Sequence, residues 1–357
     1  MPRKTWRADR DPEADAFERL YARGVTDGLP VVPPTRGRVE QAVAASGRRG
    51  DELIALVPPG FRRATVEKIA VNAVMAGCRP EYLPVVIAGV EAMCDDAFDL
   101  LGVSGTTDAV APLFVINGPV RKALEVNSGV GVFGPGWRAN ATIGRALRLI
   151  WVNVGGAKPG VISMSTFGQP GRYTYCIGEN EEENPWEPFH VEHGFAPAEG
   201  TIAALAGEPP LVISDSRSRS AGDLLATIAH GLQVVGHHKA TALGDTLILF
   251  SPEHARTIAA DRWSKARIRQ FLWERLRKPV KDLLPGADGG EGLSEKALAA
   301  YADPERNETL IAKFRAPENL KILVAGGTAG RFTALVPGWA FANAPSSLVI
   351  KKIRLPG

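Results

Sequence analysis

Segments with the pattern of buried strands alternate with amphipathic helical segments between residues 211 and 261, and this alternation restricts the possible folds more than any other feature. They follow one another at 211–213, 221–232, 246–250 and 253–261. Ser251 and Pro252 provide an N-cap and a first-turn proline for the last of these helices. Alternating strands and helices pack as layers, so we expect an α/β or α+β fold with mixed sheets flanked by helices.

The rest of the chain extends this pattern. We expect further helices at 64–77, 80–93, 141–152 and 264–281 and further strands at 113–116 and 321–325. A chain of 357 residues is long enough for two cores. We therefore predict two closely packed lobes, residues 1–195 and 196–357, the second with a flexible glycine-rich linker at 286–292. We find no internal repeat in the sequence.

Composition and charge exclude several classes of protein. A formal net charge of +3 is too small to indicate a nucleic-acid partner. The sequence has neither a signal-peptide core nor an apolar run long enough to span a bilayer, so we expect a cytoplasmic protein without membrane association. The cysteines Cys78, Cys94 and Cys176 are odd in number and lack metal-ligand spacing, which argues against a disulfide framework and a structural zinc.

The stretch 174–193 holds the densest group of reactive side chains. It contains six carboxylates, two of the chain's six histidines, a cysteine and a tryptophan. Pro185 and Pro188 are too close together for a helix interior, so we expect a loop, and loops on a rigid scaffold often carry function. A solvated acidic turn would explain the charge, but it would have no use for Trp186 and the imidazoles.

Glu181, Glu182, His190 and His193 are the candidate reactive groups of this loop. Carboxylate with imidazole suits a divalent iron, manganese or zinc ion with an open position, and such an ion acidifies its bound water. Without a metal, a crowded carboxylate has a raised pKa and acts as a general acid. Glu182 and His190 are the expected catalytic residues both with and without a metal. The sequence leaves open whether the loop holds a metal ion or an acid–base pair.

Residues 127–136 are rich in glycine and contain the pattern GxGxxG. No strand leads directly into them and Pro135 interrupts the passage to a helix, so we expect neither NAD nor flavin to bind there. The helix that follows favours an anion site instead, with Arg138, Asn140 and Arg145 as substrate-binding residues near its N-terminus. A capped, solvated amphipathic helix is the alternative.

Four other residues are weaker candidates. Gly327 and Arg331 lie in a glycine-rich turn after the strand at 321–325, which suits either an anion or a tight strand-to-helix connection. His254 lies in the first turn of its helix, where the macrodipole favours a neutral imidazole that can act in catalysis. Cys78 begins a helix and is either a catalytic thiol of lowered pKa or an inert buried thiol.

Long motifs of the chain resemble a bacterial family of uncharacterised conserved proteins. They lie at 26–35, 64–86, 138–147, 179–186 and 325–331, and include DGLPVVPPT and ENEEENPW. Proteins of this family are often encoded beside, or fused to, a protein with a cysteine- or selenocysteine-Gly-Ser-Cys (UGSC) motif. That motif is absent from this chain. The resemblance therefore implies that a UGSC-type subunit supplies a redox or nucleophilic group within an oligomer, either homo- or hetero-oligomeric.

Two functional hypotheses follow. The first is an enzyme that acts on a small anionic substrate by hydrolysis or elimination, with either a metal or an acid–base pair in the acidic loop. The second is a subunit of a thiol- or selenol-dependent complex, which performs redox or carbon–heteroatom cleavage chemistry only with its partner.

Overall fold

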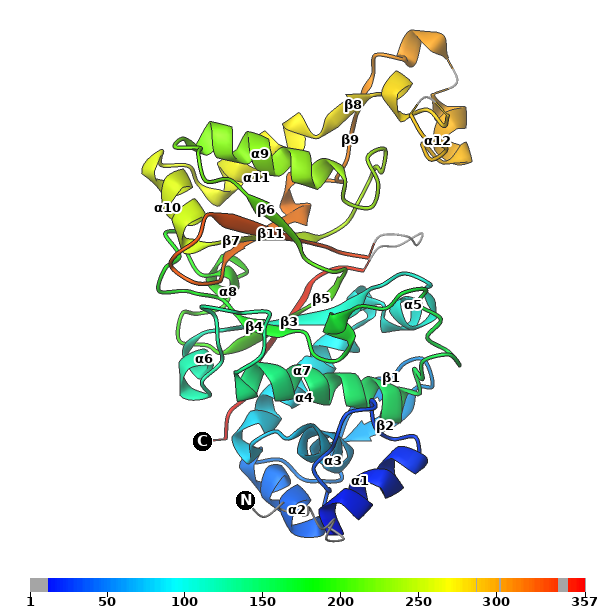
Figure 1. Ribbon diagram of the computed structural model, residues 1–357, viewed down its shortest axis with the longest axis vertical. Helices are drawn as coiled ribbons and strands as arrows, with labels where there is room; N and C mark the ends of the chain where they lie inside the picture. Colours follow the sequence, from blue (N-terminus) through cyan, green and yellow to red (C-terminus); the bar gives the residue numbers. More distant parts are fainter. Residues whose placement is uncertain (1–11, 287, 302, 340–345, 357) are drawn as a thin grey trace, which may run out of the picture.

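The structure, a computed structural model, describes residues 12–286, 288–301, 303–339 and 346–356. Two four-stranded sheets lie face to face in this part of the chain, and helices cover the outer face of each (Figure 1). In spatial order the first sheet contains β12 (Val349–Lys352), β5 (Thr201–Gly207), β3 (Ala111–Asn117) and β4 (Cys176–Gly178). The second contains β10 (Leu320–Val324), β7 (Thr246–Phe250), β11 (Phe332–Pro337) and β6 (Leu211–Ser214). The expected layered fold of mixed sheets and helices is confirmed.

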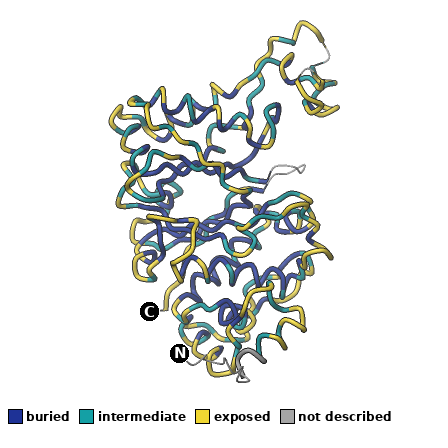
Figure 2. The backbone as a smooth tube through the Cα atoms, in the orientation of Figure 1, coloured by how far each residue is buried: buried dark blue, intermediate teal, exposed yellow. Residues whose placement is uncertain are grey.

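Three apolar clusters hold the layers together. The cluster between the sheets takes Leu113 and Leu205 from the first sheet and Leu249 and Val336 from the second. A larger cluster lies between the first sheet and its helices, and another lies between the second sheet and its helices. Every residue of β5 is buried, and buried backbone runs through the middle of the molecule in Figure 2. Apolar burial on both faces of each sheet therefore stabilises the four layers.

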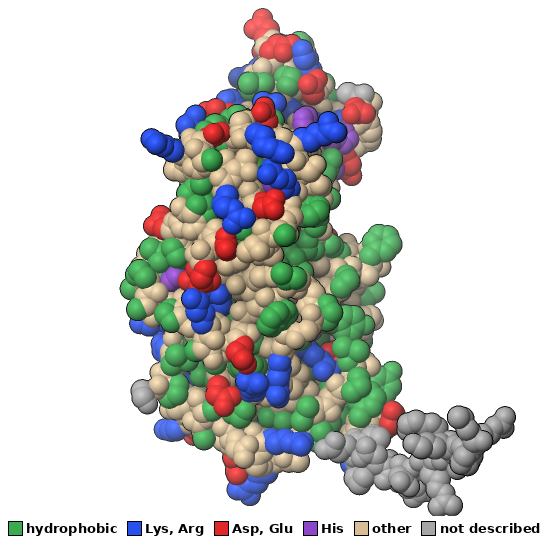
Figure 3. Space-filling model, turned by 60° about the vertical axis from the view of Figure 1, so that its left-hand side comes forward, with side chains coloured by type: hydrophobic (Ala, Val, Ile, Leu, Met, Phe, Trp, Pro, Cys, Tyr) green, Lys and Arg blue, Asp and Glu red, His purple; other side chains and the backbone are tan. Residues whose placement is uncertain are grey.

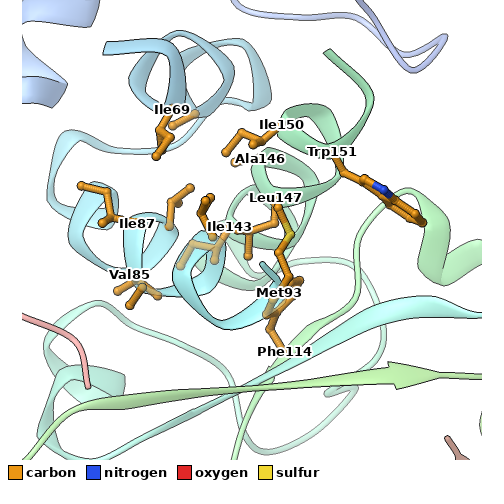
Figure 4. Packing of buried hydrophobic residues seen from close by; sticks show 14 of the residues in the cluster. Ile69, Val85, Ile87, Met93, Phe114, Ile143, Ala146, Leu147, Ile150 and Trp151 are labelled. Atoms are coloured by element: carbon orange, nitrogen blue, oxygen red, sulfur yellow. The ribbon is translucent and has the colours of Figure 1, made fainter. Parts of the chain in front are cut away.

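Helices α3 (Val66–Ala76), α4 (Leu83–Met93) and α7 (Arg138–Ile150) cover the first sheet. Figure 4 shows Ile69, Ile87 and Leu147, one from each helix, in the same apolar cluster. The hydroxyl of Thr65 accepts from the amide of Lys68 and caps α3 as the sequence predicts. The other elements on this side are α1 (Pro12–Ala22), α2 (Arg36–Ala45), β1 (Leu53–Val57), β2 (Arg62–Thr65), α5 (Leu100–Gly105) and α6 (Pro119–Ala123). The short helix α8 (Phe189–Glu192) contributes Phe189 to the cluster between the sheets.

Helices α9 (Ala221–Gln233), α10 (Pro252–Ala260) and α11 (Lys265–Arg275) cover the second sheet. The prediction of a helix over 264–281 was too long, because the chain becomes extended after Leu276 and forms β8 (Arg277–Pro279). β8 pairs with β9 (Leu310–Ala312) and, with α12 (Glu295–Ala300), forms the small projection at the top of Figure 1. The predicted linker lies in this projection, where the amide of Gly286 donates to the Gly289 carbonyl; residue 287 lies outside the described residues.

The two sheets repeat one topology. In each, one strand is parallel to the next strand of its own sheet along the chain and antiparallel to the one after that: β3 pairs with β4 and β5, and β7 pairs with β10 and β11. Between β7 and β10 the chain forms β8 and β9, which belong to the separate small sheet. The following strand then crosses to the other sheet, so that β6 pairs with β11 and β12 pairs with β5. The fold therefore contains a structural repeat with exchanged edge strands, which sequence comparison within the chain does not reveal.

This exchange corrects the predicted division at residues 195 and 196. β5 and β12 lie after that boundary in sequence but belong to the first sheet. The first sheet thus takes two strands from each side of this boundary, whereas all four strands of the second sheet lie after it, so two independent lobes at this boundary do not describe the topology. Among the described residues, no helix has both the length and the apolar character needed to cross a membrane.

Candidate functional site

The acidic stretch follows the carboxyl end of β4, next to the carboxyl end of the parallel strand β3. The neighbour of β3 on the other side, β5, is antiparallel, so the direction of pairing changes at β3. Ligands of open α/β sheets commonly bind outside the carboxyl ends of parallel strands. Helices α6 and α8 mark this edge at the left of Figure 1.

Glu179 anchors the loop from inside the protein. Its carboxylate is fully buried and accepts hydrogen bonds from the side chain of Asn117, the side chain of Asn184 at 2.8 Å and the amide of Phe189 at 2.7 Å. Burial raises the pKa of Glu179 to about 7, although these donors act in the opposite direction. Glu179 thus joins both ends of the loop to the end of β3.

Glu181 is the centre of the site. Its Oε1 atom accepts from the amide of Gly118 at 2.7 Å and from Nδ2 of Asn117 at 3.1 Å. The same oxygen lies 3.9 Å from Nε of Arg121 and 4.0 Å from Nδ1 of His190. The Glu181 side chain keeps 16% of its surface exposed, whereas Arg121 keeps 5% and His190 1%. We call these five residues the Glu181 centre; it is buried on one side and open to solvent at Glu181.

Several polar atoms of the Glu181 centre are buried without a partner. Among the described residues, Oδ1 of Asn117, Nε of Arg121 and both ring nitrogens of His190 have no hydrogen bond. An unsatisfied buried polar group costs roughly 1–3 kcal/mol, so native proteins rarely retain several of them in one place without a reason. These unsatisfied donors and acceptors, grouped around one carboxylate, are the hydrogen-bonding groups that a small polar ligand requires for binding.

The other charged groups of the stretch are paired within the chain. Glu182 binds Arg121 through both oxygens, at 2.6 and 2.8 Å, and lies 2.8 Å from Nζ of Lys122. Glu192 forms buried ion pairs with Lys265, at 2.8 Å, and with Arg269. Figure 3 turns this edge forward and shows acidic and basic side chains next to each other across the surface. The loop is therefore a set of ion pairs rather than a freely solvated acidic turn.

These pairings change the roles expected for Glu182 and His193. Glu182 neutralises Arg121 instead of pointing at His190, and it positions the guanidinium beside Glu181. His193 donates from Nδ1 to the carbonyl of Phe189 at 2.8 Å, and its ring packs on the Phe189 ring. The structure therefore brings together Glu181 and His190 of the predicted set, but neither Glu182 nor His193.

The residues described here contain no group of three or more His, Cys, Asp or Glu side chains arranged to hold a metal ion. Glu181, His190 and the amide oxygen of Asn117 are the donors that come closest to such a set. Arg121 beside them carries only N–H donors, so it cannot add a ligand atom for a cation. The donor set therefore suits an acid–base pair better than a metal site.

No family model, curated protein or solved structure matches this chain.

The predicted anion site at the start of α7 is occupied by the chain itself. Arg145 binds the carboxylate of Asp27 through two nitrogens, at 2.7 and 2.8 Å, and also donates to the carbonyls of Leu29 and Pro30. Arg138 donates from Nε and a terminal nitrogen to the carbonyl of Gly77, at 3.1 and 3.0 Å. Both guanidinium groups hold other segments against α7, so the structure does not support them as substrate ligands.

The glycine-rich residues form turns, with no strand leading into them. The buried side chain of Asn140 bonds to the amide and carbonyl of Asn127 and to the carbonyl of Cys176. At Gly327 a β-carbon would come within 2.9 Å of Val130, so the glycine allows the two glycine-rich loops to touch. Asn140 and Gly327 therefore have structural explanations.

A cavity of about 500 Å³ lies beside these loops. Its lining residues include Phe133, Asn140, Thr174, Tyr175 and Cys176. The polar groups of Asn140, Thr174 and Tyr175 are hydrogen-bonded to backbone atoms of the chain. The cavity therefore offers mainly apolar contacts, and it does not include the Glu181 centre.

The remaining predicted residues also have partners. Cys78 donates to the carbonyl of Thr142, and burial raises the pKa of its thiol to about 12, so it is an inert thiol in this structure.

Buried His254 accepts from the hydroxyl of Thr333 at Nδ1 and donates from Nε2 to a backbone carbonyl. Burial lowers its pKa, so the expected neutral imidazole is present but both nitrogens are engaged. Arg331 lies 3.2 Å from Glu253.

Sequence reasoning missed Asn117 and Arg121. Asn117 ends β3 and Arg121 lies in α6, which begins at Pro119 directly after Gly118. The signal was present in the sequence as a buried strand followed at once by polar residues and a proline that can begin a helix. What the sequence did not show is that this end of β3 adjoins the acidic loop.

Proposed function

We propose that this protein is an enzyme that transfers protons on a small anionic substrate at the Glu181 centre, in a hydrolysis or an elimination. The observation that carries this proposal is the convergence of Asn117, Gly118, Arg121 and His190 on one carboxylate oxygen, with polar atoms on three of them lacking partners. Carboxylate and imidazole form the commonest kind of acid–base pair in enzymes.

The residues have distinct roles in this proposal. Glu181, the most exposed of the group, is the base that removes a proton from substrate or water. His190 can accept or donate a proton because neither ring nitrogen is engaged by another described residue. The free Nε of Arg121 donates to the negative charge of the substrate, and the free Oδ1 of Asn117 accepts from a donor group of the substrate. Glu179 and Glu182 are positioning residues, since they hold Asn117 and Arg121.

A turnover assay with small carboxylate- and phosphate-bearing substrates tests this proposal. We expect Glu181→Gln to reduce kcat by about a hundredfold or more, because the amide keeps the shape of the side chain but cannot accept the proton. Glu183→Gln is the matched control: Glu183 lies in the same loop and pairs with Arg256 at 2.7 Å, away from the centre. The proposal fails if both variants retain wild-type turnover, or if both lose it equally.

The second candidate function is that of a subunit that requires a thiol or selenol partner. The observation in its favour is that burial raises the pKa of Cys78 and Cys94 to about 12 and also raises the pKa of Cys176. The chain's own thiols are therefore poor nucleophiles, and thiol chemistry would need a group from another protein. Mixing the protein with a UGSC-type protein tests this: a complex by size and activity only in the mixture are expected.

A further inference from the structure

A second group of unsatisfied polar atoms lies away from the Glu181 centre, at the other end of the first sheet. Arg148 projects from the C-terminal half of α7, and Arg172 ends the short turn Pro170–Arg172. The group adjoins Asp108, which comes just before β3, whereas the Glu181 centre lies where β3 ends. The two sites are therefore separated by the length of a buried strand.

Arg148 is a buried cation without an ion-pair partner among the described residues; the negative charge of Asp27 acts on it, but Asp27 is already paired with Arg145. Its residue keeps 9% of its surface exposed, and its guanidinium carbon lies 4.5 Å from the centre of the Trp151 ring. Within the described residues it has no hydrogen bond and no carboxylate within 4.0 Å, and its NH1 nitrogen is fully buried without a partner. Stacking on an indole offsets only part of the cost of removing a guanidinium from water.

Arg172 adds a second positive charge to the same place. It donates to the hydroxyl of Ser163 at 2.7 Å and to the carbonyl of Asp108 at 3.2 Å, while its Nε atom is buried without a partner. No described carboxylate lies within 4.0 Å of it either. Burial lowers the pKa of Arg148 to about 10, and the charge of Arg172 acts in the same direction, as expected for neighbouring cations.

We propose that Arg148 and Arg172 bind a small monocarboxylate between their guanidinium groups. Unpaired N–H donors on two neighbouring guanidiniums match the oxygens of a carboxylate, which would supply the missing negative charge. The carboxylate of Asp108 is close enough to act on Arg172, and one of its oxygens is buried without a partner. This existing negative charge favours a singly charged ligand over a doubly charged phosphate. Arg172 is only half-buried, so a ligand from solvent can reach the site at this residue.

Acetate titration at constant ionic strength, balanced with sodium chloride, tests the proposal through thermal unfolding and tryptophan fluorescence. We expect acetate to raise Tm saturably and to change the fluorescence of Trp151, which contacts Arg148. Arg148→Met should weaken acetate binding at least tenfold and, in chloride alone, should leave Tm unchanged or raise it, because it removes an unpaired buried charge. Arg172→Gln is a second variant that should also weaken binding.

Arg267→Met is the matched control, because Arg267 stacks on Trp263 at 4.0 Å on a different helix. It should keep the full response to acetate. The proposal is overturned if acetate has no effect beyond that of chloride, or if Arg148→Met and Arg172→Gln both respond like the wild type. A stronger response to inorganic phosphate than to acetate would overturn the assignment to a monocarboxylate. None of these results depends on turnover at the Glu181 centre.

Discussion

Nδ1 of His190 lies 4.0 Å from Oε1 of Glu181, and neither ring nitrogen of His190 has a hydrogen-bond partner among the described residues. The separation is too long for a hydrogen bond. A buried imidazole held in this state costs stability without contributing a contact. This relationship is the main reason to assign catalysis, rather than architecture, to His190.

Replacing His190 by phenylalanine should separate stability from function. We expect the free energy of unfolding to stay within about 1 kcal/mol of the wild type or to rise, because an apolar ring removes two unsatisfied polar atoms from a buried position. Activity should be lost. Urea unfolding together with the turnover assay checks both. A loss of several kcal/mol would instead show that His190 is needed for the fold.

Removing Arg145 should destabilise the protein. Its partner Asp27 keeps only 9% of its side-chain surface exposed, so Arg145→Met leaves a nearly buried carboxylate unpaired, at a cost of roughly 3 kcal/mol. The control Arg138→Met loses contacts to one exposed carbonyl and should cost about 1 kcal/mol or less. Equal effects of the two substitutions in urea unfolding would contradict the structural role assigned to the Asp27 pair.

Glu179 should make stability depend on pH. Its pKa is about 7 in the folded protein and near 4.5 when unfolded. Because the folded pKa is the higher one, its contribution is fully present below pH 4.5 and is lost as the pH rises through 7, by up to about 3 kcal/mol. Glu179→Gln should remove this decline. The test is urea unfolding of both proteins at pH 5 and pH 8; parallel pH profiles would rule out the raised pKa.

A chelator should distinguish the acid–base version of the site from the metal version. The Glu181 centre has too few acidic and imidazole ligands for a typical metal site, and Arg121 has no acceptor atom with which to ligate a cation. We therefore expect turnover to survive prolonged dialysis against EDTA. Activity that disappears on dialysis and returns with iron, manganese or zinc would favour a metal held by Glu181 and His190.

The sequence by itself determined most of the local structure. Thr65, Ser251 and their following residues define helix starts through hydrogen bonds that span three positions, and these caps occur as predicted. The strand at 246–250 follows from its continuous apolar pattern. The sequence also predicts that the acidic loop and His190 carry the chemistry, because clustered carboxylates and imidazoles are unusual in a purely structural loop.

Only the tertiary structure decided which charged groups remain available. Arg145 and Asp27 are 118 positions apart, and Asn117 and Glu179 are 62 apart, so their pairing depends on how α7 and the strands pack. β5 joins the first sheet, and β6, three residues further on, joins the second, although no local pattern distinguishes their sheets. Secondary structure arises from neighbours within a few residues, whereas the partner of a charge is set by burial and distance in the folded chain.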